Sequence, residues 1–356
     1  MFRFIGRFIA SAVILVLTGL MMAAAKYLPQ LVFPAYRNFS RSVISAMSSV
    51  TGALPFALWE ILLVLLGLLL LYSIIHTIFE KKRFLTWLSG VVLALSVLVF
   101  LFVGLWGLNH YAPELSTELN LPVTEYTKEQ LAEAAQYYLD GANQYAVQVE
   151  RDDTGVMAEQ NFTEWAKEAG ASYEPLAARY PIFSASTQPV KKALLTWKIM
   201  SETGYTGVFV AFTAESTVNP DTFVASLPYT MCHEVAHRCT IAGEDEANFA
   251  AFLACAASSD PDFLYSGYYS AFIYCYNALF DADKAAAQSV WEGTSEQLRA
   301  DCAAANVHYD QYAGPVQDAA QKVNDTYLKA FSEESGVQSY GEVTDDLIAW
   351  YLQNKA

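Results

Sequence analysis

The pentapeptide His233-Glu234-Val235-Ala236-His237 is the stretch from which the fold and chemistry of this chain are interpreted. On a helix, residues four apart share a face, so the two imidazoles can bind one zinc ion. Glu244 follows seven residues after His237, and Asn248 follows one helical turn later. A zinc hydrolase needs two histidines, a third protein ligand, a glutamate base and an open coordination position.

The spacing assigns a role to each of these side chains. We expect His233, His237 and Glu244 to be the metal ligands, with a turn before Glu244 that returns its carboxylate to the metal. Glu234 is the expected general base, because it lies beside the first ligand and can reach a water on the metal. Asn248 lies on the same helical face as Glu244 and can hydrogen-bond a ligand from behind.

Other assignments leave alternatives open. H-E-x-x-H alone also arises by chance, and the E-x-x-A-N box at 244–248 makes that explanation less favoured. Glu246 points roughly opposite Glu244 on a helix and is the less favoured ligand. A site that activates a carbonyl commonly has a further donor for the oxyanion, for which the candidates are Tyr327, the first choice, and His308 and Tyr340.

Composition divides the chain into two parts. Of its 356 residues 54% are hydrophobic and 16% charged, and the charges are unevenly placed. Residues 1–110 hold eight basic and two acidic residues (8 − 2 = +6), which leaves 13 basic and 35 acidic residues beyond them (13 − 35 = −22). An acidic domain of this kind repels polyanions, so we expect no nucleic-acid partner.

Three apolar segments, about 8–25, 61–78 and 84–108, approach or exceed the roughly 20 residues that cross a bilayer. We therefore predict a membrane region over 1–110, with the lipid bilayer as a partner, and a globular domain over 111–356. The alternative for the first segment is a cleaved signal peptide that ends near Ala23-Ala24-Ala25.

Basic residues predict the orientation in the membrane. Arg3, Arg7 and the stretch Lys81-Lys82-Arg83 are expected on the cytoplasmic side, which places the C-terminal domain of this multi-pass cell-membrane protein outside the cytoplasm. The loop 26–60 argues the other way, because it would be external and yet holds three basic residues.

The rest of the chain predicts a mainly α fold with a small β element. A helix with a cap at Thr127 is expected to run to about Ala146, others over 161–180 and 191–201, and an amphipathic helix within 26–60 lies on the membrane or packs under the domain. Val208–Thr213, β-branched and aromatic, is expected to be a strand and the only substantial one.

Five cysteines occur, and none forms a C-x-x-C pair. We expect them to be small buried residues. The alternative is that Cys232, next to a ligand histidine, tunes or inhibits the metal.

The segments 208–219, 232–237 and 244–249 resemble an uncharacterised bacterial family of three-span membrane proteins with a zinc-peptidase-like domain. Trp106-Gly107-Leu108-Asn109, Tyr265-Ser266-Gly267-Tyr268 and 323–343 also look like that family. The E-x-x-A-N box is similar to the third-ligand box of small gluzincins, which implies Glu244 as third ligand and Asn248 as the residue that orients it. In zincins the strand before the metal helix borders the cleft, and Gly207–Thr213 would be that strand.

Together these features predict a membrane-anchored zinc metallopeptidase. Its substrate would be a peptide or protein, cleaved by a zinc-bound water from which Glu234 takes a proton. Two alternatives stay open: an envelope sensor or scaffold with a structural zinc site, and a zinc amidase that acts on cell-wall peptides.

Overall fold

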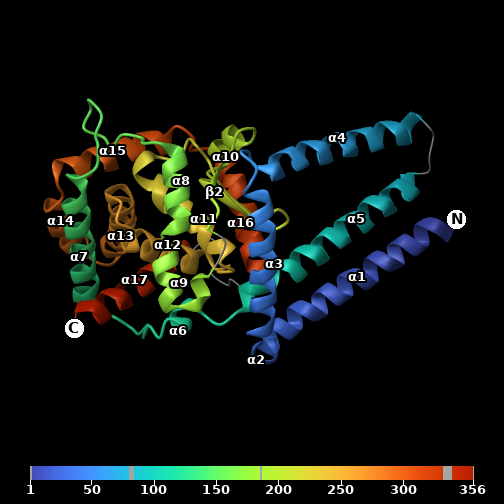
Figure 1. Cartoon of the computed structure of the whole chain (residues 1–356), viewed down its shortest axis with the longest axis horizontal. Helices are drawn as coiled ribbons and strands as arrows, with labels where there is room; N and C mark the ends of the chain where they lie inside the picture. The colour runs from blue at the N-terminus through green and yellow to red at the C-terminus, as the bar shows by residue number, and fades with distance from the viewer. Residues whose placement is uncertain (1, 80–83, 185–186, 332–338, 356) are drawn as a thin grey trace.

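The computed structural model describes residues 2–79, 84–184, 187–331 and 339–355, with the backbone alone at 2–3 and 339–341. Three helices are long and apolar enough to cross a membrane: α1 (Phe2–Tyr27), α4 (Leu58–Phe79) and α5 (Phe84–Leu105). They extend to one side of a helical body formed by residues 107–355 (Figure 1). Helices α1 and α5 pack along each other, whereas α4 diverges from them toward the body (Figure 1).

The three predicted apolar spans are confirmed as helices, but the third one ends earlier than 108. Helix α5 stops at Leu105, and a 3₁₀ helix, η1 (Gly107–Tyr111), follows. The reason lies in Trp106, whose indole turns into the body and donates a hydrogen bond to the carbonyl of His237 at 3.0 Å.

The amphipathic helix predicted within 26–60 is α3 (Ala35–Thr51), preceded by the short α2 (Pro29–Val32). It lies across the body ends of the spans (Figure 1). Ile44, fully buried, packs with Trp106, Ala211 and Ala242 of the body. Of the two predicted placements, α3 therefore adopts the one against the body.

Two long helices, α7 (Lys128–Ala146) and α13 (Pro261–Ala282), pack along each other. Their apolar residues form part of the core of the body. The predicted cap is confirmed, since Thr127 and Gln130 form a complete capping box at the start of α7. The helices that carry the motif, α11 (Leu227–Arg238) and α12 (Glu244–Ala257), pack against each other and against α13, and α12 also packs against α17 (Ser339–Lys355). The remaining helices are α6 (Leu115–Glu118), α8 (Phe162–Ala171), α9 (Glu174–Arg179), η2 (Pro181–Phe183), α10 (Trp197–Thr203), η3 (Val224–Ser226), α14 (Lys284–Glu292), α15 (Glu296–Asp310) and α16 (Pro315–Ala330).

The β element is a three-stranded sheet in the order β1-β3-β2. Strand β1 (Lys191–Lys192) pairs parallel to β3 (Glu215–Val218), and β2 (Gly207–Val210) pairs antiparallel to it. The predicted strand over 208–213 is confirmed for 208–210, but the expectation that it is the only substantial strand is wrong: the chain turns after Val210, with Ala214 in the left-handed region at φ 53°, and returns as β3. Strand β2 is left at the edge of the sheet.

Two helix predictions need correction. The helix expected over 161–180 breaks into α8 and α9, because Pro175 has no amide hydrogen for an intrahelical bond and occupies the first turn of α9. The helix expected over 191–201 begins only at Trp197, since the preceding lysines form β1. The sequence also predicts helix caps near Ser332 and Gly336, which lie outside the described residues. The predicted class is confirmed: a mainly helical chain with three N-terminal candidate spans and a small sheet.

Candidate metal centre

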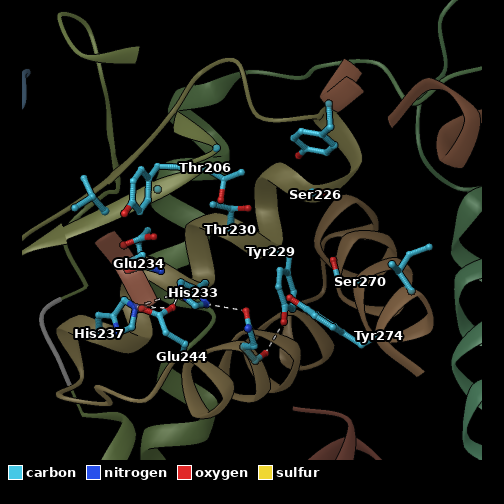
Figure 2. A pocket seen from close by; sticks show the side chains of 18 of the residues that line it. Thr206, Ser226, Tyr229, Thr230, His233, Glu234, His237, Glu244, Ser270 and Tyr274 are labelled. Atoms are coloured by element: carbon cyan, nitrogen blue, oxygen red, sulfur yellow. Dashed lines mark hydrogen bonds and ion pairs between the residues drawn. The ribbon is translucent and has the colours of Figure 1, made fainter. Parts of the chain in front are cut away.

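Helices α11 and α12 bring His233, His237 and Glu244 together at one point (Figure 2). The two Nε2 atoms lie 3.1 Å apart, and Oε2 of Glu244 lies 3.2 Å from Nε2 of His233 and 3.8 Å from Nε2 of His237. The turn between the helices makes this possible: Thr240 adopts a positive φ of 71°, and α12 then starts at Glu244 itself. The three side chains therefore lie together, as the spacing of the sequence predicts.

The second ring nitrogen of each histidine, Nδ1, lies within hydrogen-bond distance of another group of the protein. Nδ1 of His233 lies 2.9 Å from Oδ1 of Asn248, and Nδ1 of His237 lies 2.8 Å from the carbonyl oxygen of Ile241. Such partners fix the orientation and tautomer of a ligand histidine, so that Nε2 faces the metal. The sequence pattern indicates Asn248 as such a partner. It does not indicate Ile241, because the partner there is a backbone carbonyl group.

Three hydrogen bonds hold the motif helices in place, two of them from distant parts of the chain. Ser216 of β3 donates to the carbonyl of Glu234 at 2.6 Å, and Trp106 donates to that of His237. The hydroxyl of Tyr229 on α11 donates to the carbonyl of Asn248 on α12 at 2.8 Å (Figure 2). The centre is thus fixed by the sheet, by the end of a span and by its own second helix.

Glu234 is only 4% exposed, and its Oε2 atom has no hydrogen-bond partner among the described residues. Its carboxylate packs against Gly207 of β2, where a Cβ atom would come 2.3 Å from Oε1. Burial raises the pKa of Glu234 to about 8, although the neighbouring His233 opposes the shift. A buried carboxyl group with an unbonded oxygen and a pKa near neutrality can both release and accept a proton.

The charges of the cluster fit a cation. Burial lowers the pKa of His237 to about 4, which keeps its imidazole neutral and able to ligate. Burial alone would raise the pKa of Glu244, but the hydrogen bond with His233 and the positive charge that the histidines can carry hold it at about 2. Burial alone would also lower the pKa of His233, but the hydrogen bond with Glu244 raises it, so a cation would displace a proton from this imidazole. Two imidazoles with one ionised carboxylate are a donor set that zinc accepts.

Glu246 is turned away from this group. Its Oε1 atom accepts a hydrogen bond from the backbone of Leu115 at 2.5 Å. The geometry agrees with the expectation from helical phase that Glu244, and not Glu246, faces the histidines.

The cluster lies in the wall of a cavity of about 790 Å³. Beyond the centre, its lining is uncharged and rich in hydroxyl and amide groups, for example Tyr274, Ser270, Asn277, Asn306 and Tyr309. Figure 2 shows the cavity reaching from β2 and Glu234 at one end to Ser226 and Ser270 at the other. Among the described lining residues, Glu234 and Glu244 are the only acids, and no lysine or arginine occurs.

The structure separates the three oxyanion candidates. Tyr327 lines the cavity, and its hydroxyl lies 3.2 Å from Nε2 of His110, which also lines it. Burial lowers the pKa of His110 to about 4. His308 lies on α15 outside this lining, and the side chain of Tyr340 is outside the described residues. In the sequence, His110 follows the third apolar segment, and nothing in its spacing indicates a role at this site.

All five cysteines are buried and free, as expected for small core residues. Cys232 is fully buried beside the motif, and burial raises the pKa of its thiol well above the usual value. The thiol is therefore protonated.

The fold and the cluster define a class: a mainly helical chain with three candidate membrane spans and a His-His-Glu group in the wall of a cavity. The chain belongs to the family described as "Protein of unknown function (DUF3810)", whose model matches residues 36–348. No curated protein and no solved structure matches the chain.

Proposed function

We propose that the protein is a membrane-anchored zinc metallopeptidase. The observation that carries the proposal is the convergence of His233, His237 and Glu244 beside the buried carboxylate of Glu234, in the wall of a large cavity. A zinc ion at these donors would act as a Lewis acid toward the substrate carbonyl and increase the acidity of water.

Each remaining part of the site has a role in this proposal. Glu234 accepts the proton of the attacking water through its free Oε2 and later gives it to the leaving amine. The edge strand β2 binds an extended peptide by backbone hydrogen bonds, as an unpaired strand edge allows. Tyr327, paired with His110, donates a hydrogen bond to the oxyanion that forms at the carbonyl.

The number of ligands supports a catalytic centre over a structural one. Structural zinc sites are closed by four protein ligands, whereas catalytic sites keep one position open. In the described part of the chain, the group of donors that could hold a metal has three members. This favours the peptidase over the sensor or scaffold with a structural zinc.

We also propose that the helical body faces outside the cytoplasm and that residues 111–356 form the catalytic domain. The basic stretches at Arg3, Arg7 and 81–83 support the orientation. Protease accessibility of the body in intact cells, compared with inside-out vesicles, measures it. A body digested only in the inside-out vesicles would reverse the orientation.

The proposed function is tested on the purified full chain in nanodiscs, because α3 and Trp106 pack against the body. Metal content and hydrolysis of a quenched-peptide library, with cell-wall peptides included, are measured for the wild type, Glu234→Gln and Glu246→Gln. We expect about one zinc per chain in all three. Glu234→Gln should lose about 10²- to 10⁴-fold in rate, as for removal of a general base.

Glu246→Gln is the matched control, since it makes the same change two residues beyond the third ligand on a side chain turned away from the cluster. His233→Ala should lose both metal and activity. A Glu234→Gln variant with the wild-type rate, or without metal, contradicts the role assigned to Glu234. Absence of zinc from the wild type contradicts the proposal as a whole.

A further inference from the structure

We infer that the substrate is a membrane-anchored polypeptide, cleaved within a few residues of its own membrane span. The inference rests on the proposed peptidase function and names the substrate class of that site. It follows from where the cavity lies relative to the spans.

The end of one span is hydrogen-bonded directly to the wall of the site, and the end of a second span is hydrogen-bonded to a segment that leads to it. The residue that follows α5, Trp106, donates to the carbonyl of His237 at 3.0 Å. In the first turn of α4, the carboxylate of Glu60 accepts from the backbone of Leu194, Leu195 and Thr196 at 2.8–2.9 Å. These residues lead into α10, whose C-terminal loop lines the cavity.

These contacts place the site at the membrane surface. A helix of 22 residues, such as α4 or α5, is about 33 Å long, which is close to the roughly 30 Å of hydrocarbon that it must cross. Its ends therefore lie at the boundary of the hydrocarbon. Since His237 is in hydrogen-bond contact with the first residue after α5, the metal centre lies at about the depth of the lipid headgroups.

The wall of the cavity continues into a span. Phe102, inside α5, is itself a lining residue, and its ring lies 6.3 Å from that of Phe212 and 6.5 Å from that of Tyr327. An apolar surface therefore leads from the side of α5 to the cavity without a charged residue among these rings.

Apolar side chains are exposed on two helices beside the cavity and on the segment that precedes one of them. Helices α10 and α16 pack together next to the body end of α4 (Figure 1), and residues of α16 and of the loop after α10 line the cavity. We call the exposed apolar residues of α10, of α16 and of the segment before α10 the rim: Leu194, Leu195, Trp197, Ile199, Val316 and Val323, each 40–69% exposed. Exposed apolar groups gathered beside spans, with a tryptophan among them, are typical of a surface that contacts lipid.

The direction of β2 favours a polypeptide chain as the substrate bound in the cavity. The strand starts at Gly207, against Glu234, and the chain after it leads to Phe212, against Phe102 of the span. A peptide paired with this edge would reach from the metal centre to the hydrocarbon boundary over about four to six residues, at about 3.3 Å each. A polypeptide segment that emerges from a membrane span can lie along this path, with one end at the hydrocarbon boundary and the other at the metal centre. The uncharged part of the cavity beyond the metal centre can accept neutral side chains of this segment.

The test uses a single-span polypeptide reconstituted with the full-length protein in proteoliposomes. The polypeptide carries the same cleavable segment twice, next to its span and after a flexible linker of about 40 residues. Both copies are tethered, so their relative rates report position alone. We expect the copy next to the span to be cut about tenfold faster or more, at bonds within about six residues of the span.

Equal cleavage of both copies, or faster cleavage of the distant one, overturns the inference and leaves the peptidase proposal standing. No cleavage of either copy, together with none of free peptides, removes the proposed function and the inference with it. Cleavage of free peptides alone overturns the inference only.

A second measurement does not depend on activity. All five native cysteines are buried, so a cysteine introduced on the surface can be labelled selectively. A fluorophore on Ile199→Cys or Val323→Cys of the rim should be quenched by nitroxides at headgroup depth. The matched control is Val147→Cys, which is 67% exposed at the end of α7, on the side of the body opposite the spans (Figure 1). Equal quenching at all three sites, or none at the rim, contradicts the placement.

Discussion

Gly207→Ala is the substitution that most directly tests the geometry around the proposed base. A Cβ atom at this position would lie 2.3 Å from Oε1 of Glu234 and 2.7 Å from both its Cδ and Cγ atoms. Ordinary contacts between such atoms are about 3.5 Å, so the carboxylate must retreat by about 1 Å. Moving only the terminal oxygen is insufficient, because the Cγ contact is also too short.

A displacement of about 1 Å in a catalytic group can cost about 10²-fold in rate. We therefore expect Gly207→Ala to lower kcat about 100-fold while one zinc per chain remains bound, since the ligands are on α11 and α12. The overpacking should also lower stability by about 1–3 kcal/mol. Hydrolysis of the best library peptide, metal analysis and thermal unfolding measure the three quantities.

Gly314→Ala is the matched control, because nothing lies within 4 Å of a Cβ atom there and its backbone is extended. It should retain the wild-type rate. A Gly207→Ala protein with the wild-type rate would refute the close packing of Glu234 against β2 or the part that Glu234 plays. Loss of zinc in this variant would show that the effect reaches the ligands.

Three further substitutions give independent checks. Asn248→Ala removes the partner of Nδ1 of His233 and should weaken zinc binding about 10- to 100-fold in a chelator competition; unchanged affinity would contradict its orienting role. His110→Ala should lower the rate and leave the zinc content unchanged, whereas loss of zinc would identify His110 as a fourth ligand. Burial raises the pKa of Asp346 to about 7, so the folded state holds its proton more tightly and stability falls as the pH rises from about 4 through 7. Asp346→Asn should therefore be more stable than the wild type at pH 8, by at most about 4 kcal/mol, with a correspondingly higher Tm. At pH 4 the variant and the wild type should have the same Tm. A variant whose Tm equals that of the wild type at both pH values would contradict the shift.

The sequence was sufficient for the parts of the site that local periodicity determines. H-E-x-x-H and E-x-x-A-N each lie on one helix, and a short turn connects them, so the convergence of His233, His237 and Glu244 follows from helical phase and chain length. The edge strand β2 was also predictable, because its residues are β-branched and aromatic.

Strand β3 could not be predicted, because its sequence Glu215-Ser216-Thr217-Val218 reads as polar and exposed although it is buried. Each polar side chain has a distant partner: Lys191 for Glu215, the Glu234 carbonyl for Ser216 and the Trp59 indole for Thr217. The place of His110 in the site and the packing of Gly207 against Glu234 could not be predicted for a similar reason. Their importance comes from tertiary contacts that local spacing does not encode.

Strand β3 also explains how a membrane span and the proposed base are kept in register. Glu215 accepts hydrogen bonds from the backbone of Leu58 and Trp59, both at 2.9 Å, and so caps the start of α4. The next residue, Ser216, donates to the carbonyl of Glu234. Two consecutive residues of one short strand therefore connect α4 to α11, and a tilt of α4 in the bilayer would be transmitted to the helix that carries the motif. The buried Lys191–Glu215 pair, at 2.8 Å, makes this connection costly to break, because separating it would leave a buried charge without its partner.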